Sequence, residues 1–595
     1  MSSQPAALDR RDWFLLLAIW GIAALSQVLR VTVNAENMPL FSDTDDAMRM
    51  VVVRDFLAGQ NWYDIVQHRL NTPFGAEIHW SRLVDLPLAL LLALTGLFLA
   101  PGAATALTGM VWPLLLLGLL LYLSARVTLE LVGREGLLAA LALPILAPAI
   151  LAEFTPGRID HHNVVVVLVM ASLLASLLAL RRPLWAWLAG LIAATAMAVA
   201  VEALPGAVAA ILAFGFAYIL DPTRAANLVR FGLGFALGML GHLALARPPD
   251  LWLVAQCDMI SPVYGLAALA VGLAFLLAGL LPAPVRLWQR FALLAVLGLG
   301  AGALVGFVYP QCLAGPYADM DPWLLHNWIA AIVEARPWHQ SLTQVPSYAI
   351  GTAIPVLLGL LACLWALRRE PENRLGWLIL LVFIVTTAVI MLAQVRGARL
   401  ALLPAIPAAA LLIARARHAY LARPRLASGA ALVGAWLATS GLVIMLAVGG
   451  VMVLMNADQT TSATEARRER AACLAPEAYA DLGALPPERI MTPIDLGSHI
   501  LLETPHAVVA APYHRNQQGV LDTFRFFNGA AEDARAIARE RGLGLVVTCP
   551  AMPEMQSAAR AEPGTMLNLL ANDTPPDWLD EVSLGGPLKI YAILP

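Results

Sequence analysis

The chain has 595 residues, of which 59% are hydrophobic and only 13% are charged, and its mean hydropathy is +0.72. Soluble proteins carry roughly 25% charged residues, so this composition excludes an ordinary soluble fold. The net charge of −3 argues against a nucleic-acid partner, which requires a basic face. The five cysteines lack a Cys-x-x-Cys spacing and indicate no metal site of their own. The sequence therefore predicts a polytopic helical protein of the lipid bilayer.

Apolar runs of about 17 to 25 residues, long enough to cross a bilayer core, recur along residues 1–454. The breaks between them give thirteen predicted spans, at 13–31, 107–125, 137–152, 164–180, 184–201, 205–220, 228–246, 263–281, 291–309, 349–367, 375–393, 399–416 and 428–454. A further run, 86–100, is short and begins with Leu-Pro, so its assignment depends on the charges of the loops.

Arginines occupy every second loop, provided that 86–100 does not cross the membrane. They stand at positions 10, 11, 126, 134, 181, 182, 224, 230, 286, 290, 368 and 369 and within 415–425. Because positive charge stays in the cytoplasm, this alternation predicts a cytoplasmic N-terminus and an exported C-terminus. The first apolar run has no small-residue cleavage site and is typical of a signal anchor. We therefore expect a multi-pass protein of a bacterial inner membrane with about thirteen helices.

Residues 455–595 have the ordinary polar composition of a soluble domain. Ile490–Thr492, Ala507–Ala511 and Leu545–Cys549 are predicted as short strands, and Ala531–Arg541 as a helix. The chain thus divides into a transmembrane catalytic domain, 1–454, and a small periplasmic α/β domain, 455–595.

The first outward loop contains three carboxylates in four residues, Asp43, Asp45 and Asp46, followed by Arg49. Such carboxylates repel one another unless a cation or an arginine lies among them. The same residues would also suit a helix N-terminus, where Asp43 or Asp45 would act as the cap.

The second outward turn places Asp160, His161 and His162 directly before an apolar run. Ionisable groups at a membrane boundary are costly to desolvate and usually serve function. Asp160 and His162 are spaced to reach one divalent cation. The alternative is an interfacial helix start, with Asp160 as the cap and the histidines among the headgroups.

Two later outward segments carry further charges. Glu334 and Arg336 lie in the long loop 310–348, which would otherwise be an interfacial aromatic belt with a surface ion pair. Arg399 stands at the outer mouth of an apolar span, where a guanidinium suits a phosphate by bidentate hydrogen bonding, or snorkels to lipid headgroups. Together the outward residues suit group transfer from a phosphate-activated lipid assisted by a metal.

Taken in order, these motifs resemble the catalytic subunit of oligosaccharyltransferase, a polyprenyl-dependent glycosyltransferase of the GT-C fold, over nearly the whole chain. In that family an Asp of the first outer loop is followed six residues later by Arg, as Asp43 and Arg49 are here. Its second motif, Asp-x-Glu, corresponds to Asp160-His-His162. Its carboxylate on a mobile outer loop corresponds to Glu334.

The resemblance implies a role for each residue. Asp43, Asp160 and His162 would bind Mn²⁺ or Mg²⁺, and Asp43, Asp160 and Glu334 would be catalytic, with Glu334 also orienting the acceptor. Arg399, followed by Leu as in the family, would hold the phosphate of the lipid donor. His162 replaces an acidic ligand, which lowers the negative charge of the site and alters its metal preference.

The exported domain departs from the family on the acceptor side. The family signature Trp-Trp-Asp-x-Gly has become Pro493-Ile-Asp495-Leu-Gly497, without either tryptophan. Asp495, His514 and Arg515 remain the candidates for contact with the acceptor. Modification of an Asn-x-Ser/Thr sequon therefore does not follow from the resemblance.

The resulting interpretation is a metal-dependent glycosyltransferase that moves a sugar or oligosaccharide from a polyprenyl phosphate or pyrophosphate to a protein, glycolipid or polysaccharide acceptor outside the cell. One alternative is a GT-C enzyme confined to glycolipids or surface polysaccharides, which the lost tryptophans favour. The other is a transporter or flippase of lipid-linked precursors, which should carry ionisable groups near span centres.

Four of the five cysteines fall in outward segments, where an oxidising compartment would permit pairing. Cys473 with Cys549, and Cys257 with Cys312, are the pairs that this placement allows.

The predicted sidedness has a direct test. Protease added to intact spheroplasts should remove a C-terminal epitope tag and spare an N-terminal tag, because only the former faces outward. Immunoblots before and after lysis measure both. A C-terminal tag that is cleaved only after lysis would contradict the orientation.

Overall fold

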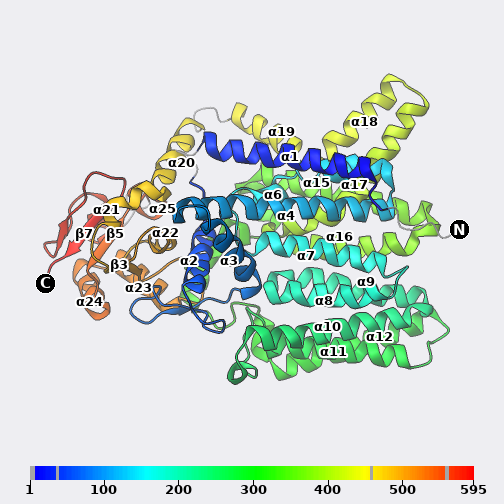
Figure 1. Cartoon of the computed structure of the whole chain (residues 1–595), viewed down its shortest axis with the longest axis horizontal. Helices are drawn as coiled ribbons and strands as arrows, with labels where there is room; N and C mark the ends of the chain where they lie inside the picture. The colour runs from blue at the N-terminus through cyan, green and yellow to red at the C-terminus, as the bar shows by residue number, and fades with distance from the viewer. Residues whose placement is uncertain (1–6, 35–38, 456–459, 557–561) are drawn as a thin grey trace.

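The computed structural model describes residues 7–34, 39–455, 460–556 and 562–595. Long, roughly parallel helices form a bundle, and a small α/β domain lies beyond one end of it, with the N-terminus at the other end (Figure 1). A mostly helical, multi-pass membrane protein with a small C-terminal sheet domain is therefore confirmed.

Within these ranges, nine helices are long and apolar enough to cross a membrane, or ten if one bent pair is counted. They are α1 (Arg10–Val33), α4 (Pro101–Leu131), α9 (Leu204–Leu220), α10 (Ala225–Ala246), α11 (Pro262–Leu280), α12 (Leu287–Val308), α15 (Pro346–Arg369), α16 (Arg374–Ala393) and α17 (Ala398–Ala422). The bent pair is α18 (Leu426–Thr439) and α19 (Gly441–Met455). Two shorter apolar helices, α7 (His162–Leu178) and α8 (Leu184–Val199), pack among them.

Two predicted spans differ from the structure. Segment 137–152 forms two short helices, α5 (Leu137–Ala142) and α6 (Pro148–Leu151), because Pro144 and Pro148 cannot donate backbone hydrogen bonds. Segment 428–454 is bent by 82° between α18 and α19. The doubtful run 86–100 lies largely in α3 (Arg82–Gly96), whose 15 residues are too few to cross a bilayer.

The bundle is organised around α17. In the apolar 18-residue stretch of α17, 94% is buried inside the protein, whereas the corresponding stretch of α12 is 0% buried. α17 contacts α15, α16, α4 and α7. Its first turn carries Arg399, and the preceding Arg396 lines one cavity together with Tyr513 and His514 of the α/β domain.

Several of the predicted cytoplasmic arginines gather at the opposite end of the bundle. Arg134 pairs with Asp9 and Asp12 beside the start of α1, and Arg181 pairs with Glu130 near the end of α4. The N-terminus lies at this same end (Figure 1). This clustering agrees with the predicted alternation, while the membrane side that it faces stays a prediction.

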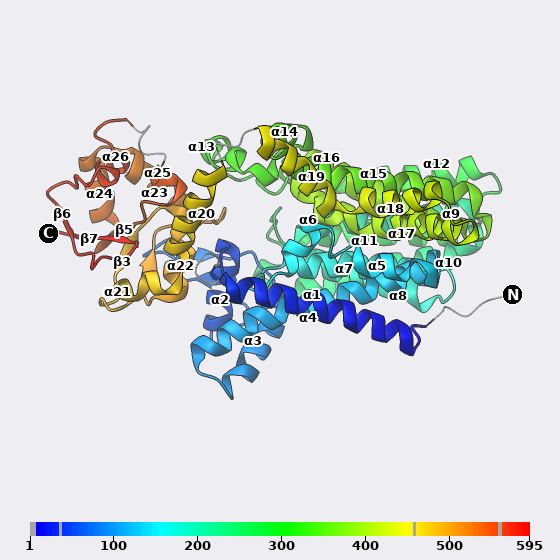
Figure 2. The same ribbon diagram turned by 90° about the horizontal axis from the view of Figure 1, so that it is seen from above.

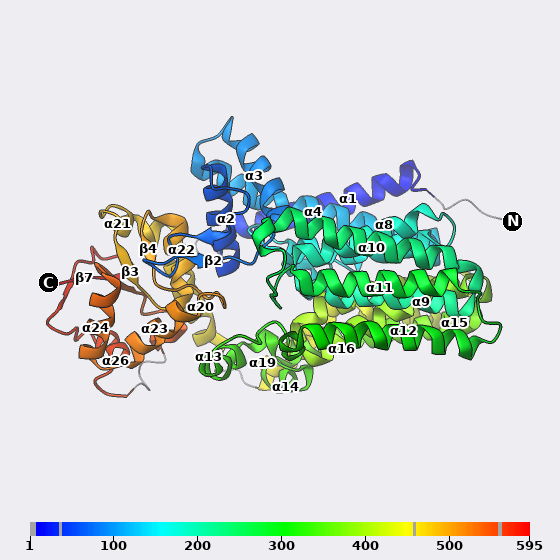
Figure 3. The same cartoon turned by 90° about the horizontal axis from the view of Figure 1, so that it is seen from below.

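Residues 39–100, between α1 and α4, join the bundle to the α/β domain. This segment contains α2 (Thr44–Leu57), the β1 (Val66–Gln67) and β2 (Ala76–Glu77) ribbon, and α3, which project from the side of the bundle (Figures 2 and 3). Arg54 donates to the Leu502 carbonyl at 2.8 Å, and Arg69 to that of Thr504 at 2.9 Å. Arg54 also donates to the Thr105 hydroxyl of α4 at 3.2 Å, so the segment is fixed to both parts.

The α/β domain contains a five-stranded sheet of order β4-β3-β5-β7-β6. Its strands are β3 (Arg489–Met491), β4 (Ala507–Val508), β5 (Leu545–Thr548), β6 (Leu579–Glu581) and β7 (Lys589–Ile593). β4, β3 and β5 are parallel, while β7 and β6 are antiparallel to their neighbours. The three predicted strands are present, the helix α24 (Ala531–Arg541) has the predicted bounds, and β6 and β7 were not predicted.

Both proposed cysteine pairs form disulfides in the structure. Cys473, at the end of α20 (Thr460–Leu474), bonds to Cys549 after β5, and Cys257 bonds to Cys312. The first fixes the connecting helix α20 to the sheet. The second fixes the loop between α10 and α11 to the loop that follows α12.

Gly157, three residues before Asp160, lies directly against the backbone of Leu40. Its φ is +94°, and a Cβ there would lie 1.8 Å from the Leu40 carbonyl oxygen. Gly157→Ala should therefore destabilise the protein by about 1–3 kcal/mol through backbone strain alone. A lowered thermal unfolding midpoint of detergent-purified protein would measure this.

Gly102→Ala is the matched control, because that helical glycine has open space around it. Equal midpoints for the two variants would contradict the close approach at Gly157.

Candidate active site

The Asp-rich motif forms the first turn of α2. Asp43 is the N-cap, and its carboxylate accepts a hydrogen bond from the Asp45 backbone at 3.0 Å. Asp46 is buried and accepts from the backbone N–H groups of Ile159 and Asp160, at 2.7 and 2.9 Å. The helix-cap interpretation therefore holds for Asp43, and Asp46 fixes the second motif against α2.

Arg158 lies among the carboxylates of both motifs. Its guanidinium donates to Asp43, to Asp46 at 2.9 Å, to Asp160 at 3.0 Å and to Glu153 at 3.3 Å. This is the arrangement that close carboxylates require, with one arginine opposing their mutual repulsion. The turn between η3 (Ala152–Phe154) and α7 is held by these bonds.

Asp45, Asp160 and His162 form a possible metal-binding group. Their ligand atoms lie within 4.8 Å of one another, and no comparable group contains Asp43 among the described residues. His161, His162 and Glu202 form a second, overlapping group. The structure thus brings Asp160 and His162 together as predicted, but beside Asp45, because Asp43 turns toward Arg158 as the helix cap.

The electrostatics of this group follow from burial and from its neighbours. Burial, Asp43 and Asp160 raise the pKa of Asp45 to about 7. Burial also opposes ionisation of Asp160, but His162 and Arg158 outweigh it and hold the pKa of that carboxyl below its usual range. Burial and the neighbouring His162 lower the pKa of His161 to about 3. A cation near Asp45 would favour its charged form.

Arg399 lies next to this group at the start of α17. Its two terminal nitrogens donate to Glu153 at 3.0 Å and Glu202 at 2.9 Å. Glu202 also approaches His162 at 3.2 Å and Arg396 at 3.4 Å. Arg399 thus lies beside the possible metal-binding group with carboxylates as its partners, and its role in holding a phosphate stays a prediction.

The charges of the cluster are compatible with a divalent cation. Six carboxylates face three guanidinium groups, which leaves three negative charges in excess in the state in which all six carboxylates are ionised and the histidines are neutral. The groups are Asp43, Asp45, Asp46, Glu153, Asp160 and Glu202, with Arg158, Arg396 and Arg399. Carboxylates with one imidazole suit Mn²⁺ or Zn²⁺ better than Mg²⁺, which prefers oxygen ligands.

A cavity of about 990 Å³, part of it open to solvent, adjoins the cluster. Asp45, His162, Glu202 and Arg396 line one part of it. Glu334, in η9 (Val333–Ala335), also lines the cavity but is exposed. The structure therefore places Glu334 at the same cavity as the possible metal ligands.

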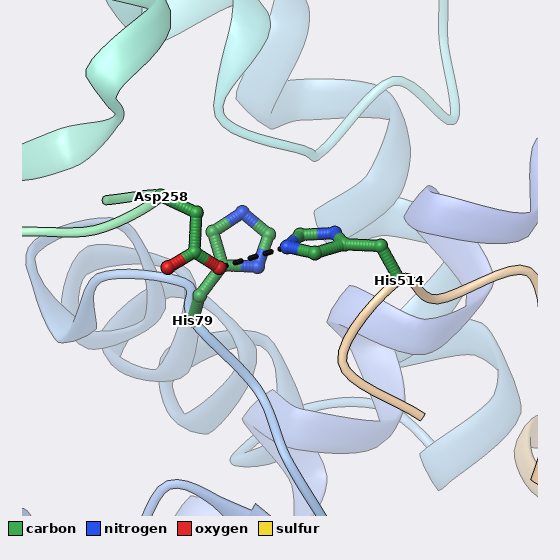
Figure 4. A group of neighbouring side chains, drawn as sticks. All are labelled: His79, Asp258 and His514. Carbon is green, nitrogen blue, oxygen red and sulfur yellow. Dashed lines mark hydrogen bonds and ion pairs between the residues drawn. The ribbon is translucent and has the colours of Figure 1, made fainter. Parts of the chain in front are cut away.

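The predicted acceptor residues are divided between two places. His514 lines the same cavity and bonds to Asp258, beside His79 (Figure 4). Arg515 also donates to Asp258, at 2.7 Å. Asp495 lies in α22 (Ile494–Glu503), where Arg470 approaches it at 3.6 Å. Within the described residues, Asp495 is not among those that line the cavity.

Sequence reasoning missed several residues of the site. Glu202 is the acidic residue at the break between α8 and α9, a position where the cost of burial is itself a signal. Arg158 stands two residues before Asp160 in the sequence and received no role there. Asp258 and His79 carried no signal, since only the folded chain brings their loops together.

The sequence matches no family model and no curated protein. The structure, in contrast, resembles solved oligosaccharyltransferases of Archaeoglobus fulgidus. AglB in complex with an inhibitory peptide and a dolichol-phosphate has a TM-score of 0.65 and 16% identity, covering 98% of this chain and 75% of that one.

Two further structures of the Archaeoglobus fulgidus enzyme give the same picture. The one tethered with an acceptor peptide containing the NVT sequon has a TM-score of 0.61 and 15% identity, covering 98% of this chain and 75% of that one. The complex with Zn and sulfate has a TM-score of 0.58 and 15% identity, covering 97% and 74%. The chain is therefore a multi-pass membrane protein of the GT-C fold, the fold of membrane glycosyltransferases.

Arg158 should be essential for the folded state. Arg158→Met leaves a buried carboxylate cluster without its shared cation, which should cost about 3–5 kcal/mol of stability. The thermal unfolding midpoint of the purified protein measures the loss.

Arg134→Met is the control, since that arginine also bridges two carboxylates but is half exposed, and surface pairs contribute little. Equal midpoints for the two variants would contradict the role of Arg158.

Proposed function

We propose that this protein is a metal-dependent glycosyltransferase of a bacterial inner membrane. It transfers a sugar or oligosaccharide from a polyprenyl phosphate or pyrophosphate to an acceptor on the periplasmic face. The observation that carries the proposal is the group of Asp45, Asp160 and His162 beside the Arg396–Arg399 pair, in a chain of the GT-C fold.

In this proposal Asp45, Asp160 and His162 hold the divalent metal, with Asp45 in the place that the sequence gave to Asp43. When bound there, a divalent ion such as Mn²⁺ would supply positive charge to balance the charge that develops on a departing phosphate. Asp43 contributes indirectly, because it shares Arg158 with Asp160.

Two arginines would meet the donor phosphate. Arg396 is partly exposed, lines the cavity and contacts Glu202 only loosely, at 3.4 Å. Arg399 uses two of its five N–H donors on Glu153 and Glu202 and keeps the others for an anion. Glu334 stays a candidate for orienting the acceptor, since its loop borders the same cavity.

We place the acceptor on the side of the cavity that the α/β domain lines. Pro512, Tyr513 and His514 of the α/β domain line the cavity. Proteins of similar fold were solved with a dolichol-phosphate and with an acceptor peptide. A protein, a glycolipid or a polysaccharide would reach the cavity from there. Transport ranks lower, since Asp160 and Arg399 lie at helix starts and not at span centres.

The test compares Asp45 and Asp160, the proposed ligands, with Asp43, which shares the first turn of α2 with Asp45. In a deletion strain complemented with each variant, Asp45→Asn and Asp160→Asn should each reduce the transferred glycan by at least about 100-fold, since a metal ion is worth several kcal/mol to a developing charge. Asp43→Asn should retain a measurable fraction. Mass spectrometry of glycolipids and periplasmic glycopeptides measures the product.

Asp577→Asn, on the exposed surface of the α/β domain, controls for the loss of one negative charge and should be silent. Near-normal product with Asp45→Asn, alongside complete loss with Asp43→Asn, would overturn the proposed ligand set. A deletion strain that lacks no glycoconjugate would overturn the function.

A further inference from the structure

A second cluster, of two histidines and an aspartate, lies in the same cavity as the possible metal ligands. His79 follows β2, Asp258 lies between α10 and α11, and His514 follows β4 (Figure 4). Their ligand atoms lie within 4.8 Å of one another. Three distant segments of the chain therefore converge on one wall of the cavity.

The carboxylate of Asp258 accepts three hydrogen bonds. It accepts from His514 Nε2 at 2.8 Å, from Arg515 Nε at 2.7 Å and from Arg515 Nη2 at 2.6 Å. These bonds fix its orientation and leave little room for a cation. We therefore interpret Asp258 as a residue that orients His514.

The bond to Asp258 also determines which nitrogen of His514 is free. An ionised carboxylate only accepts, so Nε2 carries the proton and the lone pair of the neutral ring is at Nδ1. Among the described residues, none makes a hydrogen bond to Nδ1. His514 thus combines an oriented ring with an unused basic nitrogen on a cavity wall.

Charged groups and a second imidazole surround the His514 ring. Arg515 also donates to Glu77 at 2.9 Å, so Asp258, Glu77 and Arg515 together carry one net negative charge beside His514. The ring of His79 packs against that of His514 with centroids 4.7 Å apart. Burial and the adjacent His514 lower the pKa of His79 well below its ordinary value, which keeps this neighbour uncharged.

The cavity also offers aromatic surfaces between the two clusters. Trp80, Tyr317 and Tyr513 line it together with His514 and His162. Aromatic faces with a few convergent polar groups are typical of small-molecule sites, and they suit the C–H faces of a sugar ring. An acceptor bound there would have the metal group on one side and His514 on the other.

We propose, on the basis of the function proposed above, that the acceptor is a sugar hydroxyl and that His514 is its general base, with Asp258 as the positioning residue. The hydroxyl proton moves to His514 Nδ1 while the hydroxyl oxygen bonds to the anomeric carbon of the donor. The bond from that carbon to the phosphate oxygen breaks, and the polyprenyl phosphate or pyrophosphate leaves as the anion. The imidazolium then releases its proton to solvent.

The experiment uses the full-length protein in a deletion strain. His514→Gln keeps an N–H donor for Asp258 but has no basic nitrogen, and should reduce the product by about 100-fold or more. Binding of undecaprenyl phosphate to the purified variant should stay within twofold of wild type, because His514 does not hold the donor. Methylation analysis should find the transferred sugar on a sugar hydroxyl.

Two further variants separate orientation from folding. Asp258→Asn should also reduce the product with undecaprenyl phosphate binding unchanged, because an amide can hold the wrong tautomer, and Asp258→Glu should restore part of the activity. His68→Gln is the matched control: His68 pairs with Asp64 at 3.0 Å in the segment between α1 and α4 but is exposed. It should be silent.

Three results would overturn the proposal while leaving the glycosyltransferase function intact. They are an asparagine-linked product, more than a third of wild-type product from His514→Gln, and zinc in the purified protein that His79→Gln and His514→Gln both remove. A deletion strain without any missing glycoconjugate would instead overturn the function itself.

Discussion

The contact of Arg158 with four carboxylates is the interaction on which the site depends. Two come from the start of α2 and two from the turn before α7, so one guanidinium joins segments more than a hundred residues apart. Without it, like charges would separate the two helices. With it, Asp45, Asp160 and His162 meet at the edge of the bundle.

Ion pairs that share a partner continue from this cluster toward Arg399. Glu153 connects Arg158 to Arg399, and Glu202 connects Arg399 to His162. The predicted donor-phosphate residue is thereby coupled to the metal group through buried ion pairs, whose loss is costly when one partner is removed. The α/β domain adds His514, which bonds to Asp258 in the loop between α10 and α11. The Cys257–Cys312 disulfide ties that loop to the one after α12.

Much of the fold was predictable from local sequence patterns. Apolar runs predicted most of the bundle, and Ala531–Arg541 was predicted with correct bounds because its composition strongly favours a helix. Segment 137–152 failed because its apolar character hid the effect of two prolines. β6 and β7 were missed because strands of three and five residues give a weak periodic signal.

The site was predictable where one short motif contains its chemistry, as with Asp160 and His162. The choice between Asp43 and Asp45 depended on which carboxylate became the cap of α2, and both sit at a suitable distance along the chain. Asp258 could not be predicted from the sequence, because its partners His514 and Arg515 come from a loop more than 250 residues away. Long-range pairing of this kind has no local sequence signal.

The most direct test of the central claim is the stoichiometry of Mn²⁺ binding to the purified protein, measured by electron paramagnetic resonance. We expect one Mn²⁺ per chain in the wild type, loss of that ion with Asp160→Asn or Asp45→Asn, and its retention with Asp43→Asn. Unchanged Mn²⁺ binding in both Asp45→Asn and Asp160→Asn would contradict the account.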